Sequence, residues 1–76
     1  MKLDAWIAAE IAEGRASGKK DACKKLSAAT KTTGGETVSA LTIESAAGGM
    51  RIKKYPKAKA IQDATKGAVT VAELCE

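Results

Sequence analysis

The chain has 76 residues, of which 45% are hydrophobic and 29% are charged, and its formal net charge is +4. This length allows one domain, 1–76, and no apolar run approaches the ~20 residues of a membrane span. Because histidine is absent, histidine-based catalysis and histidine-ligated metal sites are excluded. No nucleophile motif or metal-ligand cluster is recognisable, so we expect no catalytic residues, no metal, no cofactor and no small-molecule substrate.

The sequence contains two cysteines, Cys23 and Cys75, which are far apart and form no CxxC motif. A secreted domain of this size usually carries more disulfides. The N-terminus also lacks the basic start, apolar run and small-residue cleavage site of a secretory signal. We therefore expect two reduced, partly buried thiols in a cytoplasmic protein that has no membrane partner.

Basic residues are concentrated in the middle of the chain. Eleven of the 13 lysines and arginines lie between Arg15 and Lys59, where there are only three acidic residues, so this span carries +8. A basic centre between acidic ends is expected of a surface that binds phosphate. A solvated, lysine-rich face that keeps the protein soluble explains the charge about as well.

Two helices are predicted in the first 30 residues. In the segment 3–13, apolar residues recur at helical spacing: Leu3, Trp6, Ile7 and Ile11. Gly14 is a plausible end for this helix. A second, lysine-rich helix is expected from Lys19 to Ala29, with Ser17 as its cap and a face of small residues suited to close packing.

The segment 36–47 has two interpretations. As a helix, it places Val38, Leu41 and Ser45 on one side, with other apolar residues nearby. As a strand, its β-branched residues would pair with 50–53 across a Gly-Gly turn, which gives a β-hairpin at 36–53. Local evidence slightly favours the helix, and the hairpin is the alternative.

The C-terminal third carries clear boundary signals. Pro56 is expected to open a further helix, whose buried stripe comprises Ala58, Ile61 and either Ala64 or Thr65, and Gly67 is expected to end it. The stretch 70–73 reads as a capping box, in which Thr70 caps a last short helix and Glu73 reaches back to the Thr70 amide. The elements together predict an all-α compact bundle of four to five short helices.

The stretch 60–74, AIQDATKGAVTVAEL, resembles the end of small phage-type Cro/repressor helix-turn-helix regulators. In that family an AI..AT.G.VT..EL pattern forms the helix behind the DNA-binding pair and the capped turn after it. The upstream order of elements is also similar. The family's turn usually reads glycine, an apolar residue, then serine or threonine; here those places hold Lys31, Thr32 and Thr33, followed by two extra glycines, so a longer turn is expected.

The resemblance implies a lambda-repressor-like helix-turn-helix fold and a sequence-specific regulator of transcription, a repressor of phage or bacterial type. Its partner would be double-stranded operator DNA, bound by a homodimer. The helix near 36–47 would read the major groove, because short polar residues at its start suit base edges. The expected base contacts are Glu36, Thr37, Ser39, Ala40 and Thr42. The expected phosphate contacts are Lys19, Lys20, Lys31, Thr33, Arg51, Lys53 and Lys54.

A second function from another class fits the same sequence. A protein-interaction module, antitoxin-like or inhibitor-like, can use a helix-turn-helix scaffold without binding DNA. The two functions differ in a measurable way, because specific DNA binding depends on base sequence and weakens steeply with salt.

Overall fold

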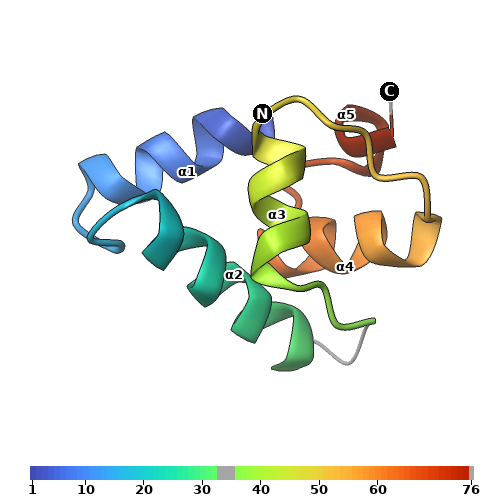
Figure 1. Cartoon of the computed structure of the whole chain (residues 1–76), viewed down its shortest axis with the longest axis horizontal. Coiled ribbons are helices and arrows are strands. Elements are labelled where there is room, and N and C mark those ends of the chain that lie inside the picture. The colour runs from blue at the N-terminus through green and yellow to red at the C-terminus, as the bar shows by residue number, and fades with distance from the viewer. Residues whose placement is uncertain (33–35, 76) are drawn as a thin grey trace.

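The computed structural model describes residues 1–32 and 36–75 (Figure 1). These residues form five helices and no strand, so the protein is all-α: α1 Leu3–Ala12, α2 Lys19–Thr32, α3 Ala40–Ala47, α4 Tyr55–Ala64 and α5 Val71–Cys75. The predicted all-α class is confirmed. The alternative of a β-hairpin at 36–53 is wrong, because 40–47 is helical and the chain that follows α3 makes no strand pairing.

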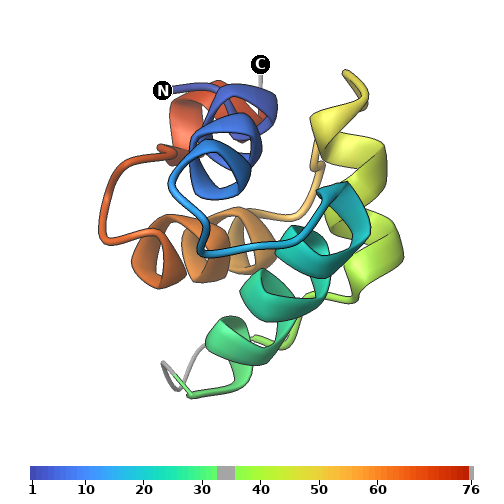
Figure 2. The same cartoon turned by 90° about the vertical axis from the view of Figure 1, so that its left-hand side faces the viewer.

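The helices enclose one core. α2 packs against α1, α3 and α4, α1 also contacts α3, and α4 packs against α5. The largest side chains that are fully buried come from several elements: Leu26, Ile43, Ile61, Val38 and Val69. Figure 2 shows α3 at one edge of the molecule, beside α2. The core is built from aliphatic residues, as the low aromatic content requires.

The first two helices follow the predicted pattern with two differences. Leu3 and Ile7 are buried, but Ile11 is 38% exposed and does not extend the buried stripe. α1 ends at Ala12, two residues before Gly14, whose φ of +78° is a left-handed conformation that glycine adopts without strain. α2 runs to Thr32 rather than to residue 29, because Thr30 faces the core and continues the helix.

The beginning of α2 is held by an acidic side chain. The amide of Ser17 donates to Asp21 Oδ2 at 3.0 Å, and Lys25 Nζ lies 3.2 Å from the same oxygen. The amide and the ammonium group lower the pKa of Asp21 below its ordinary value. A carboxylate in the first turn is also favoured by the helix dipole.

α3 begins later than predicted. Ser39 is its N-cap, and the serine Oγ accepts a hydrogen bond from the amide of Thr42 at 3.2 Å. This start places Ile43 in the core and leaves Leu41 and Ser45 exposed. The expectation that Val38, Leu41 and Ser45 share one helical side is therefore wrong. Val38 is fully buried, but it belongs to the extended segment before the helix.

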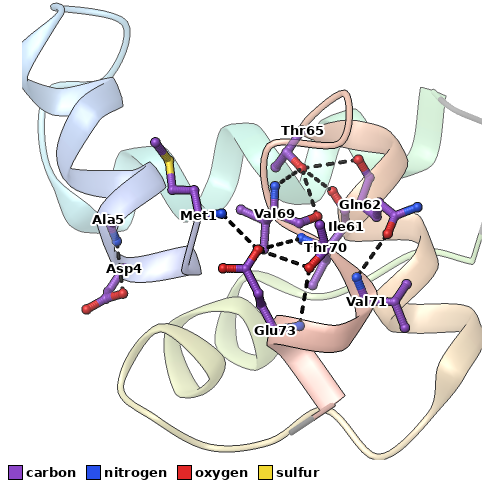
Figure 3. Close-up of polar contacts among 10 residues, drawn as sticks. All are labelled: Met1, Asp4, Ala5, Ile61, Gln62, Thr65, Val69, Thr70, Val71 and Glu73. Carbon is purple, nitrogen blue, oxygen red and sulfur yellow. Dashed lines mark hydrogen bonds and ion pairs between the residues drawn. The ribbon is translucent and has the colours of Figure 1, made fainter.

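The C-terminal predictions are confirmed. Pro56 lies in the first turn of α4, and Gly67, with a φ of +82°, follows the end of that helix. The capping box is present: the amide of Thr70 donates to Glu73 Oε1 at 3.2 Å, and the amide of Glu73 donates to Thr70 Oγ1 at 3.3 Å (Figure 3). The buried positions of α4 and its C-cap are Ala58, Ala60, Ile61 and Thr65.

Within the described ranges, none of the helices has the length and apolar character needed to cross a membrane.

Candidate nucleic-acid interface

A groove of about 380 Å³ lies beside α3. One wall is α3 itself, and the other is the connection from α3 to α4 together with the first turn of α4 (Figure 1). Ten residues line it: Leu41, Thr42, Ser45, Ala46, Met50, Arg51, Ile52, Lys53, Lys54 and Lys57. We call this feature the basic groove.

The connection that forms the second wall is anchored to α5. The amide of Ile52 donates to the carbonyl oxygen of Leu74 at 2.9 Å, and the Ile52 side chain is buried. Its neighbours Arg51 and Lys53 are exposed, as is Lys54. The buried isoleucine therefore holds the chain so that the basic residues around it lie at the surface of the groove.

The cations of the groove have no acidic partner among the described residues. The ion pairs among the described residues involve Arg15, Lys25, Lys59 and the N-terminal amine. None involves Arg51, Lys53, Lys54 or Lys57. Four positive charges along one wall create a local positive potential that attracts an anion.

The α3 wall offers apolar and hydroxyl groups. The Leu41 side chain is 75% exposed, and Ser45, one turn further on, is also exposed. The Thr42 hydroxyl lies 2.9 Å from the hydroxyl of Ser39, so it is partly engaged within the protein. Met50, which is 68% exposed, adds a second apolar side chain to the groove.

The structure separates the five expected base-contacting residues. Only Thr42 lines the groove. Glu36 and Thr37 are exposed but precede α3, and Ala40 is half-buried against the core. Ser39 is occupied as the cap of α3. The expected set assumed a helix that begins at residue 36, whereas the cap moves its start to Ala40.

The expected phosphate-contacting residues fall into separate groups. Arg51, Lys53 and Lys54 lie together in the basic groove. Lys19 and Lys20 are exposed at the beginning of α2, and Lys31 is exposed in its last turn. These three do not line the groove. Thr33 lies outside the described residues.

α2 packs against α3, and charges from both helices act on one buried thiol. The Cys23 thiol on α2 is buried, and burial is the main reason that its pKa is raised. Glu44 on α3 raises this pKa further, while Lys19 lowers it, so both charges act on the same thiol. Lys19 itself is exposed and lies outside the groove. Cys23 and Cys75 are both free thiols, and Cys75 is exposed.

Six residues of the groove were not among the sequence-based candidates: Leu41, Ser45, Ala46, Met50, Ile52 and Lys57. A signal for the first two exists, because serine is a preferred N-cap and a cap at Ser39 turns Leu41 and Ser45 away from Ile43. Lys57 follows Pro56 in the first turn of α4. Met50 carries no local signal, since its exposure depends on the path of the connection.

The described residues contain no group of three or more cysteine, aspartate or glutamate side chains that could hold a metal ion. In comparisons with known protein families, curated proteins and solved structures, nothing matches this chain.

Proposed function

We propose that the protein is a sequence-specific double-stranded DNA-binding regulator of transcription, a cytoplasmic repressor of phage or bacterial type. In this proposal α2 and α3 are the two helices of a helix-turn-helix, joined by the longer connection 33–39, and α3 enters the major groove. The observation that supports it is the basic groove: an exposed helical face flanked by four cations without an acidic partner among the described residues.

The dimensions and chemistry of DNA suit this surface. The major groove of B-form DNA accepts an α-helix, and its edges carry hydrogen-bonding groups and methyl groups. The phosphates that border the major groove of the DNA would meet Arg51, Lys53, Lys54 and Lys57 on one side of α3. Lys19 and Lys20 at the beginning of α2 would add further phosphate contacts, with backbone amides at the same helix end.

We further propose that the protein binds as a homodimer. One chain presents one reading helix and therefore covers about half an operator. Two copies related by a two-fold axis would place two such helices on a near-palindromic site. The dimer would supply the affinity that a single small domain lacks.

The test is selection from a pool of randomised DNA duplexes at two salt concentrations, followed by binding of the selected duplex. We expect enrichment of a short, near-palindromic site. With about four phosphate contacts from the basic groove of each chain, the dimer makes about eight, so affinity should fall about ten-thousandfold when salt rises fourfold. Binding without enrichment would contradict sequence-specific regulation, and no binding at low salt would contradict DNA binding altogether.

A protein-interaction module is the second candidate function. The exposure of Leu41 and Met50 favours it, because neighbouring apolar side chains on a surface often mark a protein contact. This candidate predicts no enriched DNA site. It also predicts that Leu41→Ala leaves DNA affinity unchanged.

A further inference from the structure

Leu41 has the most exposed large hydrophobic side chain among the described residues, at 75%. It lies in the first turn of α3, two positions before the fully buried Ile43. Two residues correspond to about 200° around an α-helix, so Leu41 is on the side opposite the core. Folding therefore gains little from a leucine here, and the apolar side chain is free to meet a ligand.

The surroundings of Leu41 restrict what that ligand is. The same groove holds the hydroxyls of Thr42 and Ser45, and its far wall carries Arg51, Lys53, Lys54 and Lys57. An occupant must therefore offer a small apolar group beside closely spaced negative charges. In duplex DNA, the C5-methyl group of a pyrimidine is the apolar group exposed in the major groove, and phosphates border it on both sides.

From this arrangement we infer that Leu41 determines specificity by contacting a pyrimidine C5-methyl group in the major groove. The inference rests on the proposed function and adds to it the chemical group that is read. The methyl group has two sources in DNA, thymine and 5-methylcytosine. The charge of the groove favours duplex DNA over an uncharged apolar peptide, which would leave the four cations without counter-charges.

The experiment removes the methyl group without changing base pairing. In the selected duplex, each dT is replaced in turn by deoxyuridine, and affinity is measured for the unaltered protein and for Leu41→Ala. Burial of one methyl-sized group corresponds to about fourfold in affinity. We expect one position per half-site at which uracil weakens binding of the unaltered protein about fourfold and leaves binding of Leu41→Ala unchanged.

A second set of duplexes distinguishes the sources of the methyl group. At the sensitive position, a C·G pair is introduced with either cytosine or 5-methylcytosine. If the methyl group is what Leu41 reads, methylation should restore part of the affinity for the unaltered protein and none for Leu41→Ala. Equal affinity of the unaltered protein for the cytosine and 5-methylcytosine duplexes would contradict a contact to the methyl group, which overturns the inference.

Two controls keep the result interpretable. Ile11→Ala removes a partly exposed aliphatic side chain from α1, outside the groove. Its affinities for the thymine duplex and for the uracil duplex should equal those of the unaltered protein. Thermal unfolding of Leu41→Ala should match that of the unaltered protein, because the side chain is largely exposed. If uracil weakens binding equally for the unaltered protein and for Leu41→Ala, the role of Leu41 is wrong but the proposed function stands. If no DNA site is selected at all, the proposed function itself is wrong.

Discussion

The backbone amide of Val38 donates to the hydroxyl oxygen of Thr30 at 3.2 Å, inside the core. The carbonyl oxygen of Val38 in turn accepts from Ser27 Oγ at 2.6 Å. Both Thr30 and Val38 are fully buried. Two side chains on one face of α2 thus hold the segment that precedes α3, and they determine where α3 begins relative to α2.

Replacement of Thr30 by valine should destabilise the protein. Valine has nearly the same shape but leaves the buried Val38 amide without its acceptor, which costs about 1–3 kcal/mol. The free energy of unfolding, measured by urea denaturation, checks this. Thr32→Val is the matched control, because Thr32 is exposed and its hydroxyl donates to Ala29 O of the same helix. Equal losses in the two variants would show that the Thr30–Val38 bond contributes nothing of its own.

Ser39→Ala should lower stability rather than alter base preference. The change removes the acceptor for the Thr42 amide at the beginning of α3, and loss of such a cap costs about 1 kcal/mol. Ser39→Asp retains a capping oxygen and should recover most of that loss. Ser45→Ala, on the exposed side of the same helix, should leave the thermal midpoint unchanged. A stable Ser39→Ala variant that bound a different set of selected duplexes would return Ser39 to the base-contacting residues.

Lys53→Ala combined with Lys54→Ala should weaken binding to selected and unrelated duplexes by the same factor. Phosphate contacts carry no base information, and each one lost lowers the salt dependence of affinity by about one unit of slope, here about two per chain and about four for the dimer. The control is Lys2→Ala combined with Lys59→Ala, which removes the same charge outside the groove. Loss confined to the selected duplex would instead assign the two lysines to base contacts.

The contribution of Glu73 to stability should disappear in acid. Its pKa lies below the ordinary 4.5, mainly because the N-terminal ammonium of Met1 lies 2.8 Å from Oε1 and also because the Thr70 amide donates to it. A lowered folded pKa means that the stabilisation is fully present above the unfolded pKa and is lost as the pH falls through the folded value.

Thermal unfolding of the unaltered protein and of Glu73→Gln between pH 7 and pH 3 tests this expectation. The difference between their thermal unfolding midpoints should be largest at pH 7 and should become smaller once the pH falls below 4.5. A difference that stays constant over this range would assign the effect of the substitution to the shape of the side chain and not to its charge.

Local signals in the sequence were sufficient wherever a boundary is decided within one turn of helix. Pro56, Gly14 and Gly67 mark helix ends through the φ values that they prefer. The reciprocal bonds of Thr70 and Glu73 involve residues only three apart. The basic cluster of Arg51, Lys53 and Lys54 was visible as well, because adjacent residues on one connection remain neighbours in space.

By itself, the sequence determined the helices on either side of residues 36–53, the C-terminal cap and the location of the positive charge, because each depends on residues close together in the chain. Only the tertiary structure decided how residues 36–47 divide between extended segment and helix. Their β-branched and small residues suit either conformation, so local preference is nearly balanced. Burial of Val38 and its bonds to Ser27 and Thr30, residues eight to eleven positions away, resolve that balance and leave Leu41 facing outward.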